Sequence, residues 1–162
     1  MKKSLMAALA LAILTTACNR EEKPLYTFDR AQILGEWTMT QVLYDGSMPN
    51  PLDTTTIMDF SGVGQSLVGS VNLYEMPDTG NLNISFIGQV NSLQVPVELN
   101  SSGHWEITNL DSNLVITNDT VSYTFKMVEG YSYQQRWLTE FRHYPPDSSY
   151  WADLVMEITL TK

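Results

Sequence analysis

The sequence predicts an all-β domain built from antiparallel strands. Apolar and polar residues alternate with a period of two from Trp37 to the C-terminus, and turn-forming residues divide this alternation into short runs. Alternation of this kind gives each strand one buried face and one wetter face, which is typical of antiparallel sheets. Many short strands at roughly regular spacing indicate either a barrel or a sandwich.

A short helical turn is expected before the first strand, because Asp29 can cap it and Gly35 can end it. Strands are then expected near 37–44, 54–60, 66–74, 81–90, 92–99, 103–108, 112–117, 120–129 and 152–161. Turns are expected at Asp45-Gly46, Pro77-Asp78-Thr79-Gly80, Ser101-Ser102-Gly103, Asn118-Asp119 and Glu129-Gly130. Residues 131–141 fit either a helix or a strand. Pro96 lacks an amide donor, so it is expected at an edge, at a bulge or facing solvent.

Residues 1–17 have the pattern of a secretory signal peptide, with a basic start, an apolar run over 5–14 and the small residue Ala17 at the end. The apolar run is too short for a membrane-spanning helix, which needs about 20 residues. Cys18 is the only cysteine. The Ala17-Cys18 junction resembles the bacterial lipobox, which implies that Cys18 becomes the N-terminal residue and carries lipid, palmitate included. An ordinary secretory signal with an incidental cysteine is the alternative.

Residues 18–28 are expected to form a flexible lipidated tether, because they begin with a charged segment that has little apolar surface to bury. Residues 29–162 suit a single domain. The chain has a formal net charge of −9, and it has no Lys or Arg between Arg30 and Lys126. Nucleic acid is therefore not an expected partner, since binding to phosphates depends on basic side chains. The lipid would supply the membrane attachment of an outer-membrane lipoprotein in the cell envelope, facing either the periplasm or the surface.

Gly35-Glu36-Trp37 follows the expected helical turn and opens the first strand. This resembles the G-x-W signature of lipocalins, and the likeness to bacterial lipocalin-like lipoproteins covers Cys18–Lys162 in length and strand order. The resemblance implies an antiparallel up-and-down barrel of about 8–10 strands with a short N-terminal helical turn; a β-sandwich is the alternative. It also implies that Gly35 permits a sharp turn and that Trp37 plugs one barrel end. Lipocalins place a basic side chain over this tryptophan, for which Lys162 is the candidate. Thr38 departs from the aromatic residue usual after it.

The sequence predicts no enzymatic activity, no cofactor and no metal. His104 is expected on the outside of a strand and His143 in a loop, and the two have no metal-site spacing. No serine stands in a Gly-x-Ser-x-Gly motif, and Cys18 is committed to lipid.

Two functions are compatible with these features. The first is binding of a small hydrophobic ligand, because an eight-stranded barrel has room for side chains or one small ligand. The expected ligand-lining residues are Met39, Met58, Phe60, Val71, Phe86, Val97, Trp105, Tyr123, Phe125 and Met156. The alternative is a cell-surface β-sandwich that binds glycan or a protein partner through late aromatic residues, namely Tyr131, Tyr133, Trp137, Tyr144, Tyr150 and Trp151.

Overall fold

The computed structural model describes residues 26–50, 52–144 and 150–162. The expected signal peptide, the lipidation site Cys18 and the part of the tether before residue 26 lie outside the described residues. The described elements are α2 (Arg30–Ile33), β1 (Gly35–Asn50), β2 (Asp53–Val63), β3 (Gln65–Tyr74), β4 (Thr79–Val90), β5 (Leu93–Thr108), β6 (Asn113–Thr117), β7 (Ser122–Gly130), β8 (Gln134–His143) and β9 (Ala152–Thr161). Within these ranges, no helix has the length and apolarity needed to cross a membrane.

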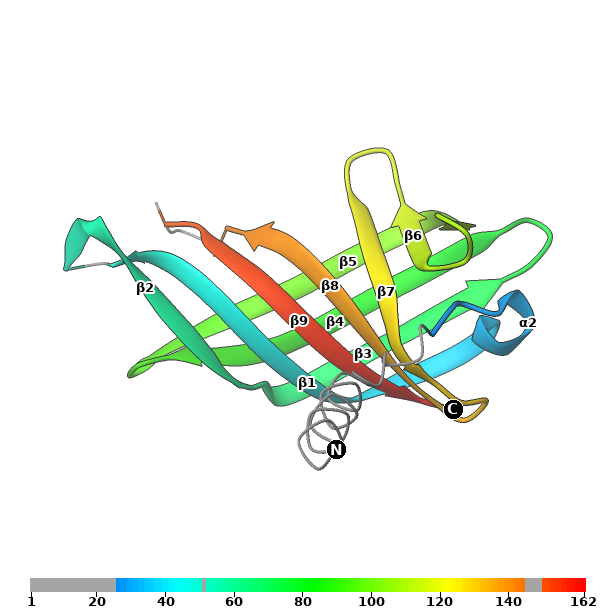
Figure 1. Ribbon diagram of the computed structural model, residues 1–162, viewed down its shortest axis with the longest axis horizontal. Helices are drawn as coiled ribbons and strands as arrows, with labels where there is room; N and C mark the ends of the chain where they lie inside the picture. Colours follow the sequence, from blue (N-terminus) through cyan, green and yellow to red (C-terminus); the bar gives the residue numbers. More distant parts are fainter. Residues whose placement is uncertain (1–25, 51, 145–149) are drawn as a thin grey trace, which may run out of the picture.

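Eight of the strands form a closed antiparallel barrel (Figure 1). The ring runs β1-β3-β4-β5-β6-β7-β8-β9, and the pairing of β9 with β1 closes it. The predicted lipocalin-like up-and-down barrel with a short N-terminal helix is therefore confirmed. The sandwich alternative is wrong, because the first and last strands of the ring are hydrogen-bonded to each other.

Strand β1 closes the barrel because it is long enough to pair with three other strands. It pairs with β9 from Thr38 to Ser47. Its first residues also pair with β3, and its last residues pair with β2, the extra strand. The β1–β2 hairpin therefore extends from one barrel end, while α2 and the C-terminus lie at the other (Figure 1).

The predicted period-two alternation places the core inside the ring. In β4, every second residue from Gly80 to Val90 is buried. The largest fully buried side chains are Trp37, Trp105, Trp137, Phe86 and Phe125. Burying such aromatic surface is the main favourable contribution to folding for a chain without a disulfide.

Three of the expected turns are wrong, because Asp45-Gly46, Ser101-Ser102-Gly103 and Glu129-Gly130 lie within strands. In the first two, the glycine allows close packing. Gly46 lies inside β1, where a Cβ would come within 2.6 Å of the Phe60 ring. Gly103 lies inside β5, where a Cβ would overlap the backbone oxygen of Thr117 on β6. The two strands expected at 92–99 and 103–108 are consequently one long strand.

The ambiguous segment 131–141 becomes mostly strand β8. This strand continues to His143, which pairs with Ala152 of β9. The expectation that His143 lies in a loop is therefore wrong, because the pairing with β9 extends the strand through it.

The barrel wall is incomplete beside the first part of β5. Residues 93–104 of β5 pair with β4, whereas β6 pairs only with 104–108. Pro96 lies in the stretch without a second neighbouring strand, so the predicted edge position of Pro96 is confirmed. This short β6–β7 hairpin leaves a gap in the hydrogen-bonded wall between β5 and β8.

Candidate functional site

Trp37 closes the barrel end that carries α2. Its side chain is fully buried, and its indole Nε1–H donates a hydrogen bond of 2.7 Å to the carbonyl oxygen of Ile33. The Lys162 ammonium lies 4.5 Å from the centre of the Trp37 ring and donates a 2.7 Å hydrogen bond to the Leu34 carbonyl. Lys162 thus occupies the position over Trp37 that the resemblance implied, and its contacts hold the C-terminal residue against α2 and the start of β1.

Arg30 forms a second contact at this closed end. Its guanidinium lies 4.6 Å from the centre of the Trp105 ring and makes ion pairs with Glu75 and Asp78 in the β3–β4 turn. The hydrogen bond from Arg30 lowers the pKa of Asp78. Trp105 donates its own indole N–H to the Tyr74 carbonyl at 2.8 Å. Salt-screened and partly exposed ion pairs add little stability alone, so this network chiefly orients α2 on the barrel.

An internal cavity of about 30 Å³ lies at the opposite end of the barrel. The surface that lines it is wholly apolar. Its lining residues are Tyr44, Met48, Phe60, Phe86, Gly88, Val90, Val95, Val97, His143, Trp151, Ala152 and Leu154. A cavity of this size holds about one water molecule, but apolar cavities stay dry because water finds no partners in them. The cavity therefore suits an apolar group.

Tyr44 reaches from β1 to the end of β4 and forms one wall of the cavity. Its hydroxyl accepts a 2.6 Å hydrogen bond from the Gln89 N–H and lies 3.2 Å from the Gln89 carbonyl oxygen. Its ring lies 5.8 Å from that of Phe86 and 6.3 Å from that of Phe60, measured between centroids. These contacts tie β1 and β2 to the end of β4, so this wall of the cavity is fixed.

His143 bridges the gap in the barrel wall at the rim of the cavity. Its Nε2 donates to the Pro96 carbonyl oxygen at 2.9 Å, across from β8 to the unpaired part of β5. Burial lowers the pKa of His143, although the Pro96 carbonyl and the Glu98 carboxylate both favour the charged ring. The neutral imidazole is therefore the form that fits beside the apolar lining.

Trp151 covers another part of the rim. The Arg142 guanidinium lies 4.2 Å from the centre of its ring, and two hydrogen bonds of 2.7 and 2.8 Å join Arg142 to the Asp153 carboxylate. This bidentate pair lowers the pKa of Asp153 and raises that of Arg142. The Trp151 ring is only partly buried, so it forms part of the cavity wall that solvent reaches.

Acidification from about pH 7 to about pH 5 is expected to destabilise the barrel through His143. The folded-state pKa of His143 lies below its ordinary value of 6.5. The folded chain therefore binds fewer protons than the unfolded chain, and stability falls as the pH drops through that ordinary value. Urea unfolding midpoints at both pH values measure this loss.

The matched controls are two glutamine variants. His143→Gln should remove this part of the pH dependence, because the amide can still donate to the Pro96 carbonyl but does not titrate. His104→Gln should retain it, because His104 is exposed at the closed end. An unchanged pH dependence in His143→Gln would contradict the assignment.

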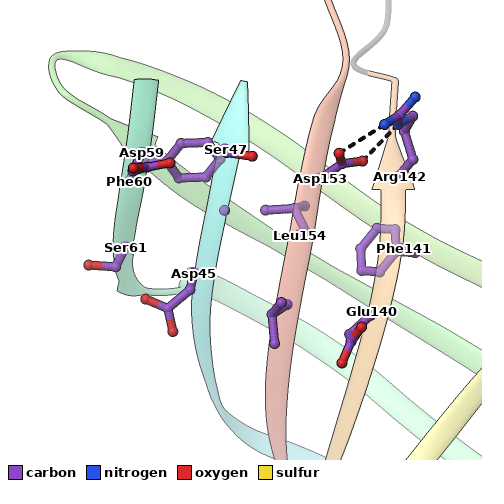
Figure 2. A pocket seen from close by; sticks show the side chains of 12 residues that line it. Asp45, Ser47, Asp59, Phe60, Ser61, Glu140, Phe141, Arg142, Asp153 and Leu154 are labelled. Carbon is purple, nitrogen blue, oxygen red and sulfur yellow. Dashed lines mark hydrogen bonds and ion pairs between the residues drawn. The ribbon is translucent and has the colours of Figure 1, made fainter. Parts of the chain in front are cut away.

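A broad groove of about 770 Å³ lies on the outside of β2, β1, β9 and β8 (Figure 2). Its polar groups include the carboxylates of Asp45, Asp59 and Glu140 and the Arg142–Asp153 pair. Phe60 and Leu154 line both this groove and the internal cavity. In the described ranges, no group of three or more His, Cys, Asp or Glu residues could hold a metal ion.

The structure separates the expected ligand-lining residues into two groups. Phe60, Phe86 and Val97 line the cavity. The other expected residues do not line it: Met39, Val71, Trp105, Phe125 and Met156 are buried, and Met58 and Tyr123 are partly buried. Sequence reasoning missed Gly88, Val90 and Val95, although they share the alternation phase of Phe86 and Val97. It missed His143 and Trp151 because their place depends on the β8–β9 pairing.

The late aromatic residues do not form one surface. Trp137 is wrong as a surface candidate, because its ring is fully buried against Phe28 and Phe125. Tyr131 and Tyr133 precede β8 and stack with ring centroids 6.0 Å apart. The remaining members, Tyr144, Tyr150 and Trp151, lie beyond the other end of β8.

No protein-family model matches the chain, and no curated protein matches its sequence.

Proposed function

We propose that the chain is a non-catalytic lipoprotein of the bacterial outer membrane whose barrel binds a small hydrophobic ligand. The proposal of ligand binding rests on the wholly apolar cavity at the end of the barrel opposite Trp37. Apolar groups bind in such a place because leaving water contributes roughly 25 cal/mol for each Å² of apolar surface buried. The lipobox-like junction at Ala17-Cys18 supports the membrane attachment.

The size of the cavity limits what it takes in its closed form. A volume of about 30 Å³ fits a small alkyl end group, whereas an apolar cavity known to bind benzene measures roughly 150 Å³. A larger ligand therefore requires the Trp151 indole to rotate out of the rim. The Arg142–Asp153 pair holds that indole from outside, so opening breaks one cation–π contact and leaves the barrel strands in place.

Gly88→Ala is expected to weaken binding of an apolar fluorophore about fourfold, because one buried methyl-sized group is worth about 0.8 kcal/mol. A Cβ at Gly88 has no neighbour closer than 3.6 Å, so the new methyl group fits without strain and occupies cavity space. Fluorescence titration of the mature protein with a fatty-acid-like fluorophore measures this change.

Two further variants make the titration specific. Trp151→Ala should strengthen binding of larger fluorophores, because it enlarges the cavity. His104→Ala, at the opposite end, should leave binding unchanged. If the wild-type protein shows no saturable binding and Trp151→Ala creates none, the proposed ligand function is wrong.

A further inference from the structure

The turns at the closed end of the barrel expose large apolar side chains to solvent. The β3–β4, β5–β6 and β7–β8 connections all lie at this end, near α2 (Figure 1). Met76 in the first turn is 88% exposed, Leu110 in the second is 93% exposed, and Tyr133 in the third is 64% exposed. Tyr131, stacked on Tyr133, is exposed as well. We call these four exposed residues the closed-end tips: Met76, Leu110, Tyr131 and Tyr133.

Two of the closed-end tips have an unfavourable backbone conformation. Met76 has φ of 59° and Leu110 has φ of 54°, in the left-handed region that glycine and asparagine adopt most easily. Turn geometry alone would favour those small residues, because they avoid the contact between Cβ and the backbone. Met76 and Leu110 instead project apolar side chains away from the barrel and bury almost none of their surface on it.

The N-terminal chain joins the barrel beside these tips. The Phe28 N–H donates a 2.6 Å hydrogen bond to the Asp111 carbonyl in the β5–β6 turn, and Tyr26 packs against the barrel core. Tyr26 lies eight positions after Cys18, so the segment that joins them reaches at most about 29 Å when fully extended. Strand β5 has 16 residues, a length of about 50 Å. The tether is therefore shorter than the barrel, and it leaves from the closed end.

We propose that the closed-end tips dock the barrel onto the lipid bilayer that holds Cys18. This inference rests on the lipoprotein part of the proposed function. Tyrosines are favoured at membrane–water interfaces, and apolar side chains enter the boundary between headgroups and acyl chains. Glu75 and Asp78 pair with Arg30 at this end, and Asp111 adds a carboxylate in the β5–β6 turn, so apolar insertion and not a basic patch drives the docking. The cavity end then faces the aqueous phase, where the ligand arrives.

Leu110 and Leu52 provide a matched pair for testing this orientation. Both are turn leucines, 93% and 96% exposed, and they lie at opposite barrel ends. Leu110→Cys and Leu52→Cys would each be made in the acylated full-length protein, whose Cys18 sulfur is blocked as a thioether. Each variant carries an environment-sensitive fluorophore on the new cysteine. The protein is then reconstituted on phosphatidylethanolamine–phosphatidylglycerol vesicles that contain spin-labelled lipid.

Fluorescence at position 110 should shift to the blue and be quenched by the spin-labelled lipid, whereas fluorescence at position 52 should do neither. Equal responses at both positions on vesicle-bound protein overturn the docking surface and leave the lipoprotein assignment intact. Failure of the native protein to float with vesicles overturns the lipoprotein assignment and the docking surface together. A blue shift at 110 without vesicles means that a second copy of the chain covers the tips, which also overturns the proposal.

Discussion

Trp37→Ala is expected to lower the free energy of unfolding by about 3–5 kcal/mol, the range for removing a large aromatic side chain from a core. The Trp37 side chain is fully buried, so its removal leaves a cavity in the core. The change also leaves the Ile33 carbonyl without the indole donor and the Lys162 ammonium without the ring beneath it. Midpoints of urea unfolding with unchanged transition slopes measure the loss.

Two variants separate the sources of this loss. Trp37→Phe keeps an aromatic plug but removes the hydrogen bond to Ile33, so its effect should be smaller than that of Trp37→Ala. Trp151→Ala removes an equally large ring from the cavity rim and should cost less than Trp37→Ala, because that ring is partly exposed. If Trp37→Ala changes stability no more than Trp151→Ala does, Trp37 is not the plug of the barrel.

Cys18→Ala is expected to move the protein from the membrane fraction to the soluble fraction, or to leave it unprocessed. A single acyl chain gives only marginal membrane binding, and stable anchoring needs a second signal. A lipidated Cys18 provides both, because its thiol and its freed amine can each carry acyl chains. The acidic chain that follows offers no basic patch in their place. Fractionation of cells that express the variant measures the change.

Mass spectrometry of the native membrane form provides the direct check. The mature protein should begin at Cys18 and carry the added mass of acyl chains. Asn19→Ala is the control and should retain both. An unmodified mature chain that begins at another residue would show that the cysteine is incidental to an ordinary secretory signal.

The proposed function assigns different tasks to the two ends of the barrel. The closed end is filled by Trp37 and Trp105, each with a basic side chain over its ring. The other end has an apolar cavity under Trp151 and beside His143. The closed end is thus filled, whereas the other end keeps the cavity that the proposed ligand would enter.

The local pattern of the sequence determined the all-β class, the inward face of most strands, and the pairing of Gly35-Glu36-Trp37 with a preceding helical turn. These features depend on neighbouring residues, since side chains two positions apart share a face of a strand. The alternation around Phe86 and Val97 therefore identified part of the cavity wall before any strand was placed in space.

The tertiary structure decided between the barrel and the sandwich that the sequence left open, and it decided where the interior of the barrel is not filled. Closure depends on β1 pairing with β9 from the far end of the chain, and no local pattern encodes which strands meet. The sequence wrongly predicted turns at Gly46 and Gly103. Each glycine makes room for a group from another strand, the Phe60 ring and the Thr117 carbonyl, and the local sequence does not show these neighbours. The cavity likewise exists because β5 extends past β6 and His143 reaches Pro96 across the gap. Such contacts join residues distant in sequence, so only the folded chain brings them together.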